Sequence, residues 1–251
     1  MCLLGFLYKE NPKYPFVFVS NRDELYTRET SAAHFWEELP HLLAGKDLEK
    51  GGSWLGISDT GDFAALTNVR DTAGNNSSKS RGDLIKSFFK ERKKFQQNLV
   101  NSNDYDGFNL IYGNMNNLFY HSNRSETRKK ITKGVHVLSN AALNTQWPKV
   151  VHLKEGLEKL LVTEDAEELV RKLFKISEAD SHFSDEMLPD TGVGIELERI
   201  LSPLFIKSEK YGTRSSTVIL LDNENNCTFI ERTYVPERME RRFQFKITNK
   251  K

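Results

Sequence analysis

The sequence has few of the residues that build disulfide frameworks and metal sites. It contains only two cysteines, Cys2 and Cys227, and no CxxC pair. Two isolated thiols argue against a disulfide framework and against a zinc site made from cysteine. The six histidines include no HExxH motif and no pair spaced four residues apart. We therefore expect no metal site and no required cofactor.

Neither sign of charge is in excess, and long apolar runs are missing. The chain has 36 Lys and Arg residues against 35 Asp and Glu residues, a formal net charge of +1. This balance gives no electrostatic reason to expect a nucleic acid or an anionic membrane as partner. No apolar run approaches the roughly 18 residues that span a bilayer, and residues 3–7 are too short for a signal-peptide core. We expect a soluble, cytoplasmic protein without a membrane span.

The order of the predicted elements indicates the fold class. Strand patterns open the chain, helix patterns occupy its middle, and strand patterns return at its end, with neighbours mostly joined as hairpins. That order predicts antiparallel sheets with helices packed outside, an α+β fold in a single domain, residues 1–251. Strands are predicted at 2–8, 15–21, 53–58, 63–67, 108–112, 118–121, 134–138, 213–221, 227–234 and 242–247.

Helices and loops are predicted between these strands. Ser80 and Asp83 have capping-box spacing, which predicts a helix that continues, in one or two pieces, to about residue 101. Further helices are predicted at 148–161, 164–174 and 195–201. Irregular or loop structure is predicted at 25–43, 71–80, 124–133 and 177–194, the first of these being irregular or helical.

The start of the chain carries the clearest chemistry. Cys2 follows Met1 and is small, so we expect Met1 to be removed and Cys2 to gain a free α-amine. An α-amine with a pKa of about 7.7–8.0 accepts a proton from its own thiol near neutral pH, as in nucleophiles that carry their own base. The first predicted hairpin would return Asn21-Arg22-Asp23-Glu24 to Cys2. The alternative is a buried cysteine in a strand.

Polar residues cluster at four predicted strand ends, where sites of layered sheets commonly form. The clusters are 21–24, 67–70, 139–140 and 212–214. They make Arg22, Asp23, Asn68, Asn140 and Arg214 candidates to line one pocket with Cys2. The alternatives are a structural ion pair for Arg22 and Asp23, and turn positions for the two asparagines.

A series of short motifs resembles a known family. The motifs, in order, are Met-Cys-Leu, Asn-Arg-Asp-Glu, Gly-Gly-Ser-Trp-Leu-Gly, Leu-Thr-Asn, Ser-Arg-Gly, Gly-Phe-Asn-Leu, Leu-Ser-Asn-Ala, Gly-Thr-Arg-Ser-Ser-Thr and Glu-Arg-Thr-Tyr. Their order and spacing resemble the NRDE family, also called the transport and Golgi organisation family, from residue 2 to about 235. The resemblance implies the four-layer αββα sandwich of antiparallel sheets found in N-terminal nucleophile hydrolases.

The same resemblance implies roles for individual residues. The layout is also similar, more distantly, to the bile-salt hydrolase and penicillin V acylase group, in which an N-terminal cysteine attacks an amide carbonyl. Cys2 matches that nucleophile, Arg22 and Asp23 match a pair at the end of the second strand, and Asn140 matches an oxyanion asparagine. Asn68 is a looser match. Arg214 is our own assignment of a cationic partner, made without an alignment.

Two functional hypotheses follow from these residues and the resemblance. The first is an N-terminal-cysteine hydrolase or acyltransferase scaffold that acts on a small-molecule amide or thioester. The second is a non-catalytic carrier that uses the same pocket for a hydrophobic cargo, either haem or an acyl lipid, because haem trafficking and acyl-lipid handling are roles proposed for the NRDE family. The sequence leaves the substrate, the haem ligand and the oligomeric state open.

Overall fold

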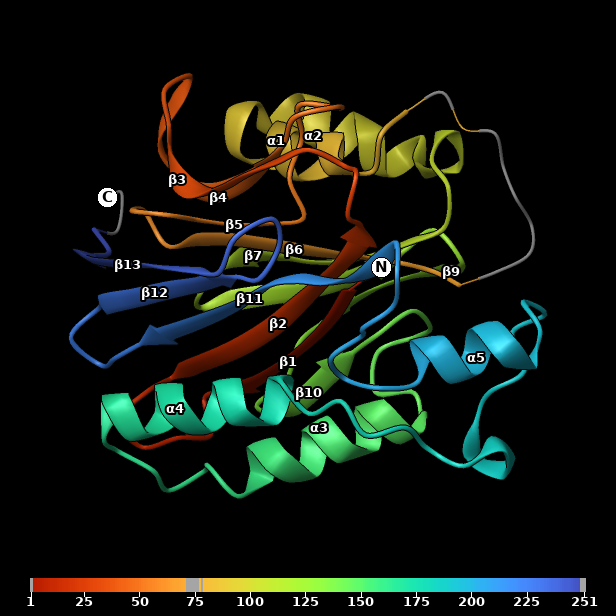
Figure 1. The fold of residues 1–251 in the computed structure, drawn as a ribbon. Helices are drawn as coiled ribbons and strands as arrows, with labels where there is room; N and C mark the ends of the chain where they lie inside the picture. Colours follow the sequence, from red (N-terminus) through yellow and green to blue (C-terminus); the bar gives the residue numbers. More distant parts are fainter. Residues whose placement is uncertain (1, 71–76, 78, 249–251) are drawn as a thin grey trace. The chain divides into compact units, whose positions relative to one another are not determined.

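The fold is known from a computed structural model that describes residues 2–70, 77 and 79–248. The chain divides into two compact units. Unit 1 comprises Met1–Thr27, Arg70–Thr72 and Thr132–Phe245, and unit 2 comprises Arg28–Val69, Ala73–Ile131 and Lys246–Lys251. Each unit is built on one antiparallel sheet with helices beside it, which confirms the predicted α+β class (Figure 1). The single domain stays a prediction.

The sheet of unit 1 has six strands in the order β10-β1-β2-β11-β12-β13. The strands are β1 (Cys2–Tyr8), β2 (Phe16–Leu25), β10 (Gly134–Leu138), β11 (Tyr211–Leu221), β12 (Asn226–Thr233) and β13 (Met239–Lys246). β1 pairs with β10 on one side and with β2 on the other, so the predicted strand at residues 2–8 lies in the interior of the sheet.

Two helices of unit 1 cover one face of this sheet (Figure 1). They are α3 (Pro148–Glu158) and α4 (Ala166–Ser177), and a third helix, α5 (Ile195–Leu201), follows the short 3-10 turn η2 (Asp185–Met187). α3 lies close to β1 because position 5 is glycine: a Cβ there would lie 2.7 Å from a methyl carbon of Leu157 and 3.0 Å from one of Leu153. This close packing fixes the second half of α3 against the middle of β1.

Unit 2 contains the second sheet, seven strands in the order β3-β4-β5-β6-β7-β8-β9. Phe88, Phe95 and Tyr112 form the aromatic centre of its core, with ring centroids 5.0–5.9 Å apart. The elements are β3 (Thr30–Trp36), β4 (Leu39–Asp47), β5 (Leu55–Ser58), β6 (Asp62–Asn68), β7 (Phe108–Asn114), β8 (Asn117–Ser122), β9 (Ser125–Lys130), α1 (Gly82–Lys90), α2 (Arg92–Val100) and η1 (Ser102–Asp104).

Two segments of unit 2 contradict the sequence prediction. Residues 25–43 were expected to be irregular or helical, but they contain β3 and most of β4. Pairing between the two strands overrides their weak β propensity, and the Trp36 indole N–H donates to the Ala44 carbonyl at 3.1 Å. Residues 124–133 were expected to be a solvated loop, but they contain the edge strand β9. Its many charged residues are typical of edge strands, which must resist pairing with other chains.

Two smaller predictions also need correction. Arg81, not Ser80, occupies the N-cap of α1, and no side chain caps that helix end. β2 continues to Leu25 instead of ending at residue 21, so Arg22 and Asp23 belong to the strand itself. Of the predicted loop at 71–80, residues 71–76 and 78 lie outside the described part of the chain.

Every helix that the structure describes is too short or too polar to cross a bilayer.

Candidate functional site

Cys2 and Arg22 are neighbours in the sheet of unit 1. Cys2 is the first residue of β1 and pairs directly with Arg22 of β2, which in turn pairs with Ser215 of β11. Directly opposed residues of antiparallel strands project from the same face, so the thiol and the guanidinium share one face of the sheet. Arg22 is buried, and Cys2 is half-buried. The hairpin therefore returns Arg22 to Cys2, as the sequence predicted.

Asp23 projects from the opposite face, because side chains alternate along a strand. It is 1% exposed, and its Oδ1 accepts a hydrogen bond from the Thr213 hydroxyl at 2.7 Å. Burial raises the pKa of Asp23, while the positive charge of Lys149 and the Thr213 hydrogen bond oppose that rise. This carboxyl group is therefore held in place by β11 and lies within electrostatic range of an amine on α3.

The two thiols of the chain differ in their surroundings. Burial raises the pKa of Cys2, and the nearby Arg22 guanidinium opposes this rise. Burial also raises the pKa of Cys227, but its neighbouring charge is that of Asp222, which raises the pKa further. Cys227 is 1% exposed and belongs to the core. The negative charge of Asp23 adds to the rise at Cys2, so its pKa stays above the ordinary value. Of the two thiols, Cys2 is the one with partial exposure and a cation beside it.

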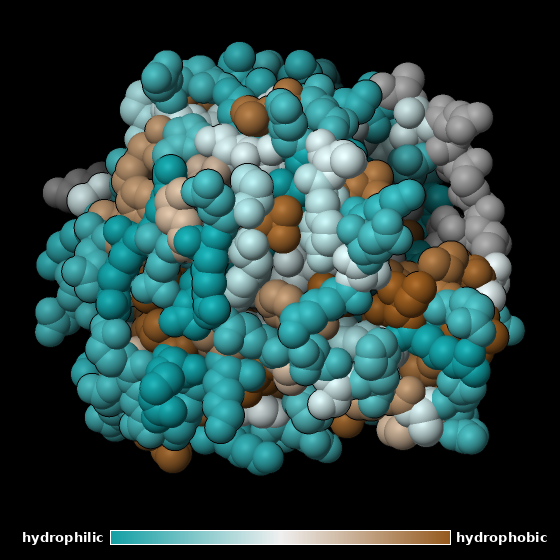
Figure 2. All heavy atoms as spheres, viewed as in Figure 1, coloured by the Kyte–Doolittle hydropathy of each residue, from teal (hydrophilic) through white to brown (hydrophobic). Residues whose placement is uncertain are grey.

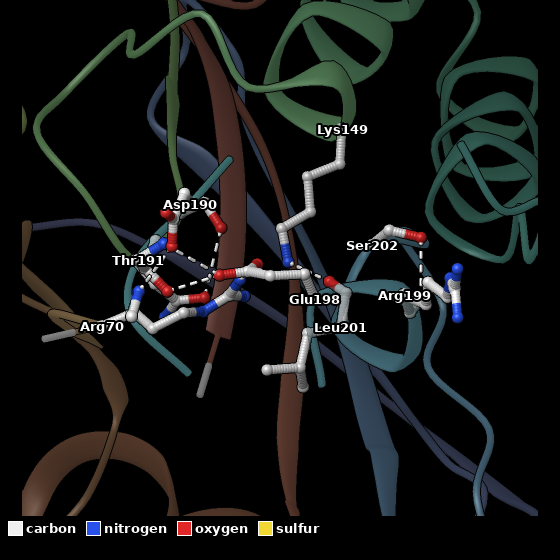
Figure 3. A network of polar contacts seen from close by, with 11 residues as sticks. Arg70, Lys149, Asp190, Thr191, Glu198, Arg199, Leu201 and Ser202 are labelled. Atoms are coloured by element: carbon white, nitrogen blue, oxygen red, sulfur yellow. Dashed lines mark hydrogen bonds and ion pairs between the residues drawn. The ribbon is translucent and has the colours of Figure 1, made fainter. Parts of the chain in front are cut away.

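A network of buried charges connects α3, α5 and the segment after β6 (Figure 3). Arg70 Nη1 lies 2.5 Å from Glu198 Oε2, and both side chains are almost fully buried. Glu198 Oε1 accepts from the Thr191 hydroxyl at 2.5 Å and from the Thr191 backbone N–H at 3.2 Å. The Lys149 amine donates to the Leu201 carbonyl at 2.9 Å. Neither Lys149 nor Glu198 was predicted from the sequence, because both lie in helices whose patterns show only amphipathic character.

Lys149 links this network to the residues predicted from the sequence. The pKa of Lys149 is lowered to about 8, first by burial and then by the positive charge of Arg70, while Asp23, Glu198 and Cys2 act in the opposite direction. Tyr211 belongs to the same group, since burial raises its pKa and the charges of Asp23 and Cys2 add to the rise. The amine of Lys149 therefore acts electrostatically on both Cys2 and Asp23.

The remaining candidates have different surroundings. Asn140 is buried just after β10, and its backbone carbonyl accepts from the Arg70 N–H at 2.7 Å, so it positions Arg70. Arg214 occupies a bulge in β11, and its Nη1 donates to the carbonyls of Leu25 and Tyr26 at 3.0 and 2.5 Å. It therefore holds the chain that follows β2. Asn68 belongs to unit 2, where it ends β6 opposite Phe108. A shared pocket for all six candidates stays a prediction.

Metal binding has no support in the described part of the chain, where no group of three His, Cys, Asp or Glu residues is arranged to hold an ion.

Comparisons with known proteins find matches over nearly the whole chain. A family model described as Transport and Golgi organisation 2 matches residues 1–236. The chain is 32% identical over 268 residues to the Transport and Golgi organization protein 2 homolog of Bos taurus, across 96% of each chain. It is 30% identical over 258 residues to the homolog of Homo sapiens, across 93% of each chain.

Solved structures show the same fold at low sequence identity. A mutant of conjugated bile acid hydrolase from Clostridium perfringens aligns with a TM-score of 0.54 at 9% identity, over 100% of this chain and 95% of that one. A second variant of the same hydrolase gives a TM-score of 0.53, also at 9% identity, over 100% and 99% of the two chains. These likenesses confirm the predicted N-terminal-nucleophile-hydrolase-like fold.

Proposed function

The chain belongs to the Transport and Golgi organisation 2 family, and we propose that it is an N-terminal-nucleophile hydrolase or acyltransferase that acts on an amide or a thioester through Cys2. One observation supports the proposal above all others: Cys2 is the first residue of an interior strand, directly opposite Arg22 and next to the buried Asp23. In a fold of this class, that position is suited to a nucleophile at the start of the mature chain.

The proposed reaction needs only the residues of this chain and water. After removal of Met1, the α-amine of Cys2 accepts the thiol proton, and the thiolate attacks the carbonyl carbon of the substrate. The bond from that carbon to the leaving nitrogen or sulfur then breaks, and the leaving group takes the proton from the ammonium group. Water attacks the resulting thioester with the amine again as base, which releases a carboxylic acid and restores the thiol.

The neighbouring side chains support this chemistry. The Arg22 guanidinium favours the thiolate over the thiol, because it is a cation on the same face of the sheet. Asp23 orients the α-amine and balances its charge. We propose the Asn140 amide as an oxyanion donor, and one such donor contributes about 3 kcal/mol to transition-state stabilisation. The Lys149 amine adds positive potential close to the developing charge.

Labelling and acyl transfer test the proposal directly. The mature protein, made without an N-terminal tag, is incubated with iodoacetamide or with acyl thioesters of N-acetylcysteamine, and its intact mass is recorded. We expect one adduct and one acyl-enzyme, both lost in Cys2→Ala. The Cys227→Ala variant is the matched control and should react like the wild type. Absence of any acyl-enzyme with thioester or amide substrates, together with unreactive Cys2, would contradict the proposal.

A carrier function is the second candidate, and one surface feature favours it. Figure 2 shows apolar side chains gathered over α5, where Ile195, Leu197 and Ile200 are 38–48% exposed. Apolar surface of this kind suits the transfer of a hydrophobic cargo, such as haem or an acyl lipid. In cells that lack the protein, full complementation by Cys2→Ala would favour the carrier. A haem titration then tests whether haem is the cargo. A thiolate-type Soret band that is present in the wild type and absent in Cys2→Ala would identify Cys2 as the ligand of the haem iron.

A further inference from the structure

A groove in unit 2 lies between helix α2 and the end of the sheet formed by β7, β8 and β9. Four residues of α2 line it, and their spacing of three or four places them on one face of the helix: Arg92, Phe95, Gln96 and Leu99. The groove has a volume of about 340 Å³. Small-molecule pockets measure about 300–1,000 Å³, so this one is suited to a ligand of one or two rings.

The base of the groove is a buried aromatic cluster. The centre of the Phe95 ring lies 5.0 Å from that of Phe88 and 5.1 Å from that of Tyr112, and the three side chains are 1–5% exposed. Leu99 and Phe119 pack against this cluster and are only partly buried. A ligand in the groove therefore covers apolar surface that rests on a close-packed core, which favours an apolar body.

Two arginines border this apolar surface, and they differ in their charge balance. The guanidinium carbon of Arg92 lies 3.6 Å from the centre of the Phe88 ring, and Arg92 Nη2 pairs with Asp62 Oδ2 at 2.5 Å. The guanidinium carbon of Arg128 lies 3.8 Å from the centre of the Phe119 ring. Arg128 forms no ion pair within the part of the chain that the structure describes. The groove therefore carries one positive charge without a counter-charge, which suits one anionic group on the ligand.

The stacked guanidinium groups also favour a planar ligand. A guanidinium that lies on a ring with one face keeps its opposite face and its edges for other partners. The edge matches the two oxygens of a carboxylate, and the open face stacks on an aromatic ring. Solvent reaches both groups, since the Arg92 side chain is 46% exposed and Arg128 is an exposed residue. A ligand can therefore contact them from the groove.

We propose that this groove is a second ligand site, which binds an aromatic monocarboxylate of one or two rings. The carboxylate pairs with the edge of the Arg128 guanidinium, and the rings lie against Leu99 and Phe119. The site goes beyond the proposed function, because none of its lining residues is assigned to the reaction at Cys2. Binding requires no turnover, so its test is independent of the test for acyl transfer.

Isothermal titration calorimetry with three matched ligands tests the site. Naphthalene-2-carboxylate has the planar rings and the charge, naphthalene-2-carboxamide lacks the charge, and decalin-2-carboxylate lacks the planar rings. We expect the naphthoate to bind about tenfold more tightly than the amide, because charge-assisted bidentate hydrogen bonds are about twice as strong as neutral ones. It should bind about threefold more tightly than the decalin acid, because a guanidinium stacks on an aromatic ring but not on a saturated one.

Arg128→Gln removes the charge that pairs with the carboxylate, and Lys129→Gln is its matched control. Lys129 is the next residue of β9, is also exposed, and pairs with Tyr120, so it projects from the other face of the sheet. Arg128→Gln should weaken naphthoate binding about tenfold and leave naphthamide binding unchanged, whereas Lys129→Gln should change neither. Circular dichroism shows whether each variant folds, and the three-ligand comparison in the wild type decides the question if Arg128→Gln does not.

Gln96→Trp tests the location of the site from the side of α2. Gln96 is an exposed residue that lines the groove, so an indole there fills the groove and should abolish naphthoate binding. Gln97→Trp is the matched control, because Gln97 is also exposed but lies outside the groove. It should bind the naphthoate like the wild type.

The outcomes separate this site from the nucleophile. No naphthoate binding, equal binding of the amide, equal or tighter binding of the decalin acid, or full binding by a folded Arg128→Gln protein would overturn the site. Equal effects of Gln96→Trp and Gln97→Trp would overturn it too. Naphthoate binding that depends on Arg128, in a protein that forms no acyl-enzyme at Cys2, would support this site and contradict the proposed function. An acyl-enzyme without Arg128-dependent binding would do the reverse.

Discussion

Replacing Lys149 with methionine should make the protein more stable at neutral pH. Lys149 is 4% exposed on α3, and its amine donates to the Leu201 carbonyl at 2.9 Å (Figure 3). Methionine has a similar length and needs no hydration, so it fills the same space. The variant removes an amine whose charged form is disfavoured by burial.

The magnitude follows from the pKa of Lys149. Lowering a lysine pKa from 10.5 to about 8 corresponds to about 3 kcal/mol of unfavourable free energy when the amine is charged in the folded state. Losing the donor to the Leu201 carbonyl offsets about 1–2 kcal/mol of that gain. The Lys149→Met protein should therefore be about 1–2 kcal/mol more stable than the wild type near pH 7.

The difference should depend on pH in a defined direction. The unfolded amine keeps its proton up to about pH 10.5, whereas the folded amine loses it near pH 8. Because the unfolded state binds more protons between these values, wild-type stability from this group rises with pH across that window. Lys149→Met lacks this rise, so its advantage should shrink between pH 8 and pH 10.

Urea denaturation at pH 7, 8, 9 and 10, followed by tryptophan fluorescence, measures this effect. Lys159→Met, an exposed lysine just after α3, is the control and should change stability little at any pH. A Lys149→Met protein that is less stable than the wild type at pH 7, with a difference that does not vary with pH, would refute the reasoning.

Three further predictions concern the same unit. Glu198→Gln leaves Arg70 buried without a counter-charge and should lower the free energy of unfolding in urea by about 3–5 kcal/mol, so a loss below about 1 kcal/mol would contradict a buried pair. Gly212→Ala should lower stability by about 1–3 kcal/mol, because its Cβ would lie 2.3 Å from the Tyr26 hydroxyl; an unchanged thermal midpoint would argue against that close packing. In protein that retains Met1, the rate of Cys2 alkylation by iodoacetamide should still increase with pH above the range in which an ordinary thiol titrates, because burial raises the pKa of Cys2. A rate that is already constant below pH 8 would contradict the raised pKa.

The sequence predicted the part of the site that depends on local pairing. Residues 3–7 and 16–19 are apolar runs with a polar connection between them, which predicts an antiparallel hairpin, and its register brings Arg22 opposite Cys2. Burial of both faces of β1 was also predictable, because a strand that is apolar on both faces must be covered on both faces. The strands at 30–36 and 39–47 were not predictable in this way, since their pairing overrides residues such as Ala33 and Pro40 that give no strand signal.

The buried charges could not be predicted from the sequence. Arg70 and Glu198 are separated by 128 residues, and each looks like an ordinary surface residue in its own segment. Lys149 follows a proline at the first turn of a helix, a position that is usually exposed. Burial of a charge depends on partners that only the folded chain brings together, so local patterns carry no record of it.

The position of β1 sets an order of events during synthesis. The β1–β2 hairpin can form as soon as residue 25 has left the ribosome, but its outer edges are closed by β10 and β11, which end at residues 138 and 221. Until then the nascent chain carries two apolar strands with unpaired backbone groups, which are open to other chains. The strand that begins at Cys2 is enclosed earlier, once β10, which ends at residue 138, pairs with it, so the proposed removal of Met1 by an aminopeptidase has the shorter of the two intervals.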